Sequence, residues 1–442
     1  MVLSLLALLL VPLAIHLASA ALAGWRYVTP GPQPTRRGKP FLSLIRPVCG
    51  RDAFDEETLR SSFRQAYPAY EVIFCAACET DPAVPLLRRL IAEHPHVPAK
   101  LLIGETRLTG NPKLNNLFKG MAAAQSDGLV MTDSNLLLDR DYLTRLVATW
   151  REDTGLVSAP PVGSRPGNFW GAVECAFLNS SQGRWQLAAD SLGLGFAQGK
   201  TLFWKRAVLE SGGGLEALGR NLAEDVASTK LVRAQGLKVR LARRLFAQPI
   251  GKRQARAVWD RQLRWSRVRR DGFPGLFMGE IVQGPLLSLV GLAGLVSVGA
   301  ASFWTLPLLL ALWYAVEWAL CRVAGWPAAP RDIAAMLVRD LLLPAIWVAT
   351  WAGRGISWRG TDMAPDIAPG GAARSTAGAA EERRDRTGNR NSPHRQGRPG
   401  DPRAHCHARG ADRHRDRRLA GEPRLAGHLE RDAGGDRRRH RR

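Results

Sequence analysis

The sequence predicts an α/β protein that is anchored in a membrane by apolar helices at both ends of its folded part. Three observations lead to this prediction. Short apolar runs with strand character alternate with helical periodicities between residues 41 and 133. Residues 2–25 are almost continuously apolar, and further apolar stretches follow residue 281. With 442 residues, the chain can form a sizeable core and more than one module.

Residues 1–25 are predicted to form an N-terminal transmembrane helix, because their length is about what a helix needs to cross a bilayer. Four basic residues lie between positions 26 and 39, so the positive-inside rule places the following segment in the cytoplasm. A cleaved signal peptide is the alternative, but its basic n-region is missing. A linker rich in Pro and Gly is expected at 26–40.

The next part of the chain reads as a mostly parallel sheet with crossover helices, since strand and helix alternate. The expected strands cover residues 41–47, 70–75, 100–103 and 128–131. The expected helices cover residues 58–67, 83–94 and 114–125.

The fourth of these strands ends on a carboxylate, Asp133, which is followed by Ser134 and Asn135. In open α/β sheets, ligands bind at this carboxyl edge. A carboxylate there can hold a divalent cation, and the cation can hold a diphosphate. Asp, Ser and Asn also favour turns, so an ordinary turn cap is the alternative for Asp133.

A second block, residues 142–272, carries Glu224-Asp225 at a predicted helix start, where carboxylates meet the positive end of a helix. It ends in a basic run, residues 252–270. A C-terminal membrane region is expected at 280–360, with two or three helices. Its last apolar stretch contains Arg339 and Asp340, which need a partner or a polar cavity at membrane depth unless the segment lies in the interface.

Residues 370–442 form an Arg-rich tail with twenty Arg, ten Asp or Glu, and no Val, Ile, Phe, Trp, Tyr, Met or Lys. Such a segment has almost nothing to bury, so it is predicted to be disordered. It is either a solvated tail or a segment that binds anionic lipid, and no specific nucleic acid partner is expected. The six Cys are scattered through the chain, which argues against a secreted disulfide framework.

Four motifs follow one another in order along the chain. They are Gly110-Asn111-Pro112-Lys113-Leu114-Asn115-Asn116-Leu117, Asp133-Ser134-Asn135, Glu224-Asp225 and Arg261-Gln262-Leu263-Arg264-Trp265, the last fitting the pattern (Q/R)xxRW. On these residues, and on the closing Ile356-Ser357-Trp358-Arg359, the chain resembles GT-A-fold membrane glycosyltransferases, and among them the ceramide glucosyltransferases. The resemblance covers residues 41–359 and implies a cytosolic GT-A nucleotide-sugar-binding domain at 41–275.

The resemblance implies transfer of glucose from UDP-glucose to the primary hydroxyl of ceramide, with inversion at the sugar carbon. It places Asp133 at the position of the metal-coordinating carboxylate, for Mg²⁺ or Mn²⁺. Asn135 stands where a stricter DxD motif has its second acid, and an amide oxygen also ligates a hard cation. Asp225 takes the position of the general base that accepts the proton of the lipid hydroxyl. An ordinary helix-start carboxylate is the alternative for Asp225.

The resemblance also assigns residues that bind the donor. Arg264 and Trp265 lie in the motif near the donor diphosphate, although Trp265 also suits core packing. Lys113 either contacts the donor or orders its loop. The family has an Asp after the second strand that recognises uridine. Cys78 stands there in this chain, so Glu79 is taken as the replacement carboxylate.

Two further interpretations stay open at the level of sequence. In the first, the chain is a glycosyltransferase whose acceptor is another lipid, such as a hopanoid or a phospholipid head group. In the second, the chain is a non-catalytic basic membrane protein that binds anionic lipid. The expected location is the bacterial inner membrane or another membrane that faces the cytoplasm. The expected partners are UDP-glucose, ceramide or a similar lipid, and the membrane itself.

Overall fold

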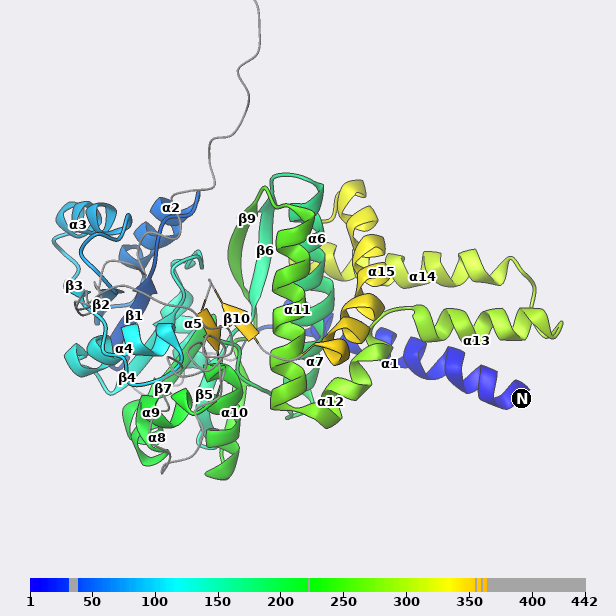
Figure 1. Ribbon diagram of the computed structural model, residues 1–442, viewed down its shortest axis with the longest axis horizontal. Coiled ribbons are helices and arrows are strands. Elements are labelled where there is room, and N and C mark those ends of the chain that lie inside the picture. The colour runs from blue at the N-terminus through cyan, green and yellow to red at the C-terminus, as the bar shows by residue number, and fades with distance from the viewer. Residues whose placement is uncertain (32–38, 222, 354–355, 359–360, 364–442) are drawn as a thin grey trace, which may run out of the picture. The chain divides into compact units, whose positions relative to one another are not determined.

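The computed structural model describes residues 1–31, 39–221, 223–353, 356–358 and 361–363 (Figure 1). The tail at 370–442, whose disorder the sequence predicts, lies outside these residues, as do residues 32–38 of the expected linker. The described residues combine an α/β unit with a group of long apolar helices.

A seven-stranded sheet with the order β3-β2-β1-β4-β7-β5-β8 forms the centre of the α/β unit. Its strands are β1 (Leu42–Val48), β2 (Tyr70–Ala76), β3 (Ala99–Ile103), β4 (Gly128–Thr132), β5 (Thr154–Ser158), β7 (Thr201–Lys205) and β8 (Lys238–Leu241). β1 to β4 pair in parallel, and the α/β fold class is confirmed. β7 runs antiparallel to β4 and β5, because its chain enters the sheet from the edge at which β4 ends. The sheet is therefore mixed.

Alternate residues of the parallel strands face two different cores. Val72 and Val130 belong to one buried cluster, which α3 (Val84–Glu93) and α5 (Tyr142–Thr149) cover. The neighbouring Ile73 and Leu129 belong to a second cluster, under α4 (Pro112–Ala123) and α10 (Glu224–Ala234). Successive side chains of a strand point to opposite faces. Helices on both faces thus explain why the strands are continuously apolar.

The helix expected at 58–67 begins earlier and is shorter. α2 spans Asp55–Arg60 and continues as the 3-10 turn η1, Ser61–Phe63. Three acidic residues occupy its first turn, where they meet the positive end of the helix. The Ser61 hydroxyl donates to the carbonyl of Thr58 at 2.6 Å. Such bonds compete with regular helix hydrogen bonding and favour an early end.

A helical run links the sheet to the apolar helices. It consists of α6 (Phe169–Ala176), the π-helical stretch η2 (Phe177–Gly183) and α7 (Arg184–Ser191). Beside α6 lies a two-stranded sheet, β6 (Pro161–Pro166) with β9 (Phe246–Gly251). α11 (Ala255–Gly272) follows this sheet and packs against α15 (Pro330–Ala352), as Figure 1 shows. The short elements α8 (Arg206–Ser211), α9 (Gly214–Gly219), β10 (Ile356–Trp358) and β11 (Thr361–Met363) complete the described chain.

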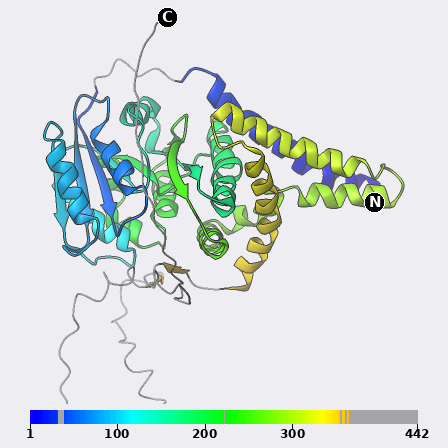
Figure 2. The same cartoon turned by 90° about the horizontal axis from the view of Figure 1, so that it is seen from above.

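Among the residues that the structure describes, three helices are long and apolar enough to cross a membrane, namely α1 (Val2–Val28), α14 (Thr305–Ala324) and α15. α12 (Pro274–Met278) and η3 (Gly279–Gln283) form a fourth candidate with α13 (Leu286–Ser297), bent by 53°. The break falls at Gly284-Pro285, where proline cannot donate a helix hydrogen bond. α1 packs along α13 and α14 (Figure 2). Apolar helices are therefore present in both expected regions.

Buried charges lie among these helices, and we call them the membrane charge cluster: Arg184, Glu317, Arg339 and Asp340. Nη2 of Arg339 donates to both carboxylate oxygens of Glu317 at 3.0 Å and to Oδ2 of Asp340 at 2.9 Å. The Tyr314 hydroxyl donates to the same Asp340 oxygen at 3.0 Å, and Arg184 lies 3.7 Å from Glu317. None of the four charged side chains is more than 4% exposed. These contacts supply the partners that Arg339 and Asp340 need.

Candidate functional site

The candidate site lies at the carboxyl edge of the central sheet. β4 ends at Thr132, which pairs with Thr201, the first residue of β7. The backbone N–H of Asp133 donates to the carbonyl of Lys200 at 3.2 Å. The antiparallel entry of β7 thus brings the turn before β7 beside the loop after β4.

Arg46 of β1 orders the loop that carries Asp133. Its side chain is completely buried, and Nη2 donates to the carbonyl oxygens of Asp133 at 2.8 Å, Ser134 at 3.0 Å and Leu136 at 2.8 Å. Nη1 donates to the carbonyl of Thr58 at 2.6 Å. Burial lowers the pKa of Arg46 to about 10, against the opposing charges of Tyr142 and Asp133. Arg46 therefore acts on the loop backbone.

Five polar side chains meet at this edge, and we call them the carboxyl-edge cluster: Lys113, Asp133, Asn135, Lys200 and Glu224. Lys113 Nζ lies 2.7 Å from Asp133 Oδ1 and 2.7 Å from Glu224 Oε1. Lys200 Nζ lies 2.9 Å from Asp133 Oδ2 and 3.0 Å from Asn135 Oδ1. The two amines thus connect the predicted metal-binding loop to the start of α10.

Local structure fixes the position of each amine. Asn111 caps α4 by accepting from the N–H of Lys113 at 2.9 Å, and its own amide donates to Glu224 at 3.0 Å. The Lys113 amine also donates to the carbonyl of Gly199 at 2.6 Å. A Cβ at position 199 would lie 2.7 Å from Glu224 Oε1, so a larger residue there would displace the Glu224 carboxylate from its place beside Lys113.

The cluster is only partly closed to solvent, since its charged side chains are 12–25% exposed. Burial disfavours the charged form of each of these side chains and shifts its pKa accordingly. For Asp133, the charges of Lys113 and Lys200 outweigh burial and hold its pKa well below the usual range. For Lys113, Asp133 and Glu224 outweigh burial and raise its pKa. For Lys200, burial prevails and lowers its pKa. The side chain of Asp133 thus pairs with amines, which a simple turn cap would not require.

Asp225 adjoins the cluster at the first turn of α10. Its carboxylate accepts from the backbone N–H of Val226 at 2.8 Å and of Gly199 at 3.2 Å. Burial, followed by the charge of Glu224, raises the pKa of Asp225 to about 6, although both N–H donors oppose the shift. The two neighbouring acids therefore differ: Glu224 is ion-paired with Lys113, whereas Asp225 is held by backbone amides. A carboxylate with such a pKa is deprotonated at pH 7 and is a stronger base than an ordinary aspartate.

The (Q/R)xxRW motif lies on α11. Arg261 donates to the completely buried Glu174 of α6 at 2.8 Å, and its charge also lowers the pKa of Lys200 after burial has done so. Trp265 packs against Leu178 and neighbouring buried residues, which is the core-packing alternative for that side chain. Arg264 lies on the same helix, one residue before Trp265. α11 thus comes within electrostatic range of the cluster through Arg261.

Two carboxylates follow β2, and they lie in different surroundings. Glu79 pairs with Arg88 at 2.6 Å on the surface, where both side chains are more than half exposed. Asp81 is buried and accepts from the backbone N–H of Gly50 at 2.9 Å and of Ala83 at 2.9 Å. Asp81 therefore orders its loop, whereas Glu79 is accessible to a ligand. Among the described residues, no hydrogen bond or ion pair joins Glu79 to the carboxyl-edge cluster.

The donor set suits a hard divalent cation. Asp133 and Asn135 direct side-chain oxygens to one ammonium group, that of Lys200, so two oxygen ligands already converge on a positive charge. Carboxylate and amide oxygens are ligands that Mg²⁺ accepts, usually together with water and phosphate oxygens. Among the described residues, no group of three or more His, Cys, Asp or Glu could hold a metal ion. A cation held by Asp133 and Asn135 would take its other ligands from the substrate or from water.

Of the residues that the sequence analysis assigned to the site, Lys113, Asp133 and Asn135 lie together and Asp225 adjoins them, but the analysis gave no role to Lys200, Arg46 or the pairing of Glu224. A single Lys in the turn-rich stretch before β7 was the available signal for Lys200. An Arg within the apolar strand β1 was the signal for Arg46, because a buried guanidinium must find acceptors.

The sequence pattern of glycosyl transferase family 21 matches residues 4–373. Among curated proteins, the chain is 29% identical to ceramide glucosyltransferase 1 of Caenorhabditis elegans over 294 residues, which cover 65% of this chain and 62% of that protein. It is 25% identical to ceramide glucosyltransferase 3 of the same organism, over 72% of each chain. A ceramide glucosyltransferase of Komagataella phaffii is 37% identical over 110 residues, 24% of this chain and 22% of that protein.

Among solved structures, the chain is similar to a mannosyltransferase from Pyrobaculum calidifontis, determined with GDP-Man and Mn²⁺. The TM-score is 0.44 and the sequence identity 18%, over 76% of this chain and 99% of that one. The chain spans less than two thirds of the length of ceramide glucosyltransferase 1, whereas the family pattern covers most of this chain. The chain belongs to glycosyl transferase family 21, and the curated relatives that it resembles are named as ceramide glucosyltransferases.

Proposed function

We propose that this glycosyltransferase transfers glucose from UDP-glucose to the primary hydroxyl of ceramide, with inversion at the anomeric carbon. The observation that carries the proposal is the turn at Gly199-Lys200, which contacts both halves of the site. Gly199 donates to Asp225, and Lys200 pairs with Asp133. A candidate base and a candidate diphosphate site therefore share one turn. The curated relatives named as ceramide glucosyltransferases support the choice of substrates.

On the donor side, we assign Asp133 and Asn135 to a Mg²⁺ or Mn²⁺ ion, which when bound supplies positive charge to the leaving diphosphate. Lys113 and Lys200 add two positive charges beside the same loop. Ammonium groups bind phosphate oxygens as point charges. Arg264, Trp265 and Glu79 are the further residues that we assign to the donor.

On the acceptor side, we assign the general base to Asp225. Its carboxylate takes the proton of the lipid hydroxyl while the hydroxyl oxygen bonds to the anomeric carbon of glucose. The bond from that carbon to the UDP oxygen breaks, and its electron pair stays on the diphosphate. Attack opposite the leaving group inverts the anomeric centre. The pKa of about 6 leaves Asp225 deprotonated at neutral pH, as this step requires.

The lipid acceptor reaches the site from the membrane in this proposal. α11 packs against α15, so the helix that carries the (Q/R)xxRW motif touches a candidate membrane span. We assign the α/β unit to the cytosolic side, because basic residues follow α1. The bilayer is then the bacterial inner membrane or another membrane that faces the cytoplasm.

A substrate panel tests the proposal. Membranes that contain the full chain are given radiolabelled UDP-glucose, UDP-galactose or GDP-mannose together with ceramide, a hopanoid or a phospholipid, and the lipid products are identified by mass spectrometry. Glucosylceramide from UDP-glucose and ceramide is the expected product. Transfer only to a hopanoid or phospholipid would contradict the acceptor, and transfer only from another donor would contradict the sugar.

A further inference from the structure

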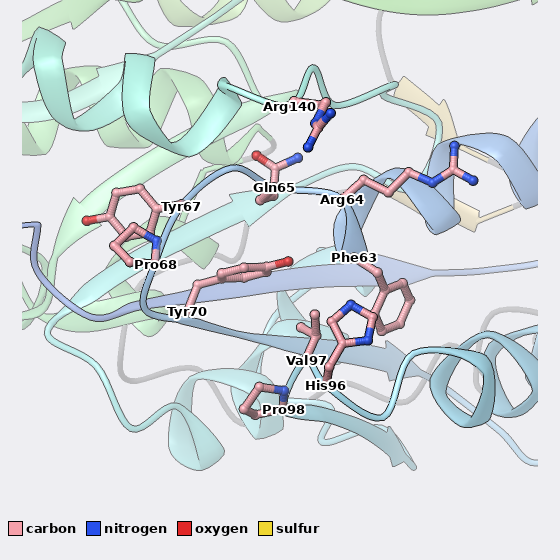
Figure 3. A pocket seen from close by; sticks show the side chains of 10 residues that line it. All are labelled: Phe63, Arg64, Gln65, Tyr67, Pro68, Tyr70, His96, Val97, Pro98 and Arg140. Carbon is pink, nitrogen blue, oxygen red and sulfur yellow. The ribbon is translucent and has the colours of Figure 1, made fainter.

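A cavity of about 640 Å³ opens at the opposite edge of the sheet from the carboxyl-edge cluster. Its lining comes from the segment between η1 and β2, from the residues just before β3, and from the turn before α5. The lining residues are Phe63, Arg64, Gln65, Tyr67, Pro68, Tyr70, His96, Val97, Pro98 and Arg140, shown in Figure 3. We call this cavity the back-edge pocket. Its volume lies in the range of sites for small organic molecules.

The back-edge pocket is separate from the proposed donor site. Tyr70 is the first residue of β2, and Pro98 directly precedes β3, whereas Asp133 follows the last residue of the parallel strand β4. A strand of seven residues such as β2 is about 20 Å long. The two sites therefore lie at opposite ends of the parallel strands, and a ligand in one does not touch the residues of the other.

The lining carries positive charge and contains no carboxylate. Neither the Arg64 nor the Arg140 guanidinium makes a hydrogen bond or ion pair with any residue that the structure describes, and Arg64 meets the charge of Glu57 only at longer range. Asp139 and Asp141 flank Arg140 in sequence, but both pair with Arg145, at 2.8 and 3.4 Å. The positive charge of the pocket is thus left without a local counter-charge, as expected for an anion site.

A buried hydroxyl adds a neutral donor. Tyr70 is 7% exposed, and its hydroxyl forms no hydrogen bond of good geometry with the described residues, although it lies near the backbone of Gln65. Figure 3 shows this hydroxyl pointing into the space between Gln65 and Phe63, and the Arg140 guanidinium pointing toward Gln65. Burying a hydroxyl without a hydrogen-bond partner costs free energy, and a hydrogen bond to a ligand oxygen would offset that cost.

The remaining walls are ring-bearing and apolar. Phe63, Tyr67, Pro68, Val97 and Pro98 surround the polar groups. The Tyr67 hydroxyl already donates to the carbonyl of Pro40 at 2.6 Å, so Tyr67 offers its ring to the pocket. The Arg140 guanidinium matches the oxygens of a phosphate, and the walls match an apolar or ring-bearing body.

We propose that the back-edge pocket binds a phosphate ester, with the phosphate held by Arg140 and the Tyr70 hydroxyl and the organic body against the ring-bearing walls. The phosphate belongs either to a soluble metabolite or to a lipid head group, which present the same chemistry to these residues. This site does not depend on the proposed transfer reaction.

Titration of the full chain in detergent with phenyl phosphate, followed by calorimetry, tests the proposal. Saturable binding is expected, weakened about tenfold or more by Arg140→Ala, because a charge-assisted hydrogen bond is lost. Lys238→Ala removes an exposed positive charge at another strand and is the matched control, with unchanged binding expected. Absence of saturable binding, or equal weakening by both substitutions, would overturn the proposal.

Two further variants separate binding from folding and from the donor site. Tyr70→Phe removes a hydroxyl that makes no hydrogen bond of good geometry with the described residues, so the melting temperature should hold while phenyl phosphate binds about three- to tenfold more weakly. Lys113→Met alters the donor site and should leave phenyl phosphate binding intact. Binding that Lys113→Met abolishes and Arg140→Ala preserves would place the anion at the carboxyl-edge cluster and overturn the proposal.

The two sources of phosphate are distinguished in nanodiscs. Phenyl phosphate is titrated against the full chain in discs of phosphatidylcholine and in discs that also contain phosphatidic acid. Competition by phosphatidic acid that Arg140→Ala removes would identify a lipid head group. Unchanged phenyl phosphate binding in both discs would identify a soluble ester. Loss of binding in both kinds of disc would overturn the proposal, because the site must exist in the bilayer.

Discussion

The carboxyl-edge cluster and the membrane charge cluster are built from the same kinds of group but differ in what they leave open. In the membrane charge cluster, two arginines face two carboxylates, and none of these side chains is more than 4% exposed. In the carboxyl-edge cluster, charged side chains are 12–25% exposed, and Asp225 stands beside them with its carboxylate held by backbone N–H groups. In the membrane charge cluster, the charged side chains are paired with one another and join helices. In the carboxyl-edge cluster, a ligand can take the place of the protein partners.

The comparison teaches that burial of charge alone does not mark an active site. A saturated buried pair costs desolvation and is weak evidence for a catalytic role. Charges that remain in reach of solvent, next to a carboxylate whose pKa is raised, meet the requirements of catalysis. Substitutions in the carboxyl-edge cluster should therefore affect turnover, and those in the membrane charge cluster should affect folding.

The largest expected effect on turnover in the donor half comes from Asp133→Ala. We expect transfer to fall about a thousandfold, because the variant loses the carboxylate assigned to the cation, and such charge stabilisation supplies several kcal/mol. Excess EDTA should reduce transfer by the wild-type protein similarly, and added Mg²⁺ or Mn²⁺ should restore it. Initial rates of lipid glucosylation measure both effects. Full activity in EDTA would exclude the assigned cation.

Glu317→Gln should destabilise the protein by about 3–5 kcal/mol, because it leaves the buried Arg339 without one of its two counter-charges. The melting temperature of the full chain in detergent measures this loss. The matched control is Glu210→Gln, where the carboxylate is 55% exposed and a change below about 1 kcal/mol is expected. Equal melting temperatures for both variants would contradict a structural role for the membrane charge cluster.

Lys113→Met should raise the KM for the nucleotide-sugar by about ten- to a hundredfold, since an amine that faces the diphosphate contributes about 1.5–3 kcal/mol. Loss of the amine also leaves Glu224 without its cation, so the melting temperature is measured in parallel. If only the melting temperature falls while KM is unchanged, Lys113 orders the loop and does not bind the donor.

The smallest effect concerns pH. The base must be deprotonated, so kcat/KM should fall about tenfold per pH unit below pH 6 and stay level above it. The raised pKa of Asp225 also makes the folding stability of the protein depend on pH. The folded pKa of Asp225 lies above the unfolded value of about 3.9, so the stability that its protonation provides is fully present below pH 4 and is lost as the pH rises through 6. A rate that is independent of pH between 5 and 7 would contradict this assignment.

The sequence pattern singled out the candidate residues that local signals mark. Asp133 directly follows an apolar strand, and Asp225 lies in the first turn of a helix, so both positions follow from chain periodicity. The four parallel strands were equally visible, because each is a short apolar run between polar segments. The two cores beneath them follow from the alternation of side chains in such runs.

The remaining features depend on pairing between distant segments. Lys200 reaches Asp133 only because β7 enters antiparallel, opposite Thr132, and no local pattern specifies that direction. Glu317 lies 22 residues before Arg339 on another helix, so their ion pair follows from helix packing. The three carbonyl acceptors of Arg46 Nη2 lie in a loop 87 to 90 residues further along the chain. These are contacts of tertiary structure, which periodicity does not encode.

The most direct test of the account compares UDP-glucose binding with single-turnover transfer in Asp225→Asn. The amide keeps the size of the side chain but cannot take the proton of the acceptor. We expect donor affinity within about threefold of wild type and transfer reduced by about a thousandfold, as for loss of a general base. Glu216→Gln, at an exposed helix start, is the control and should retain wild-type transfer. Transfer by Asp225→Asn within tenfold of wild type would contradict the account.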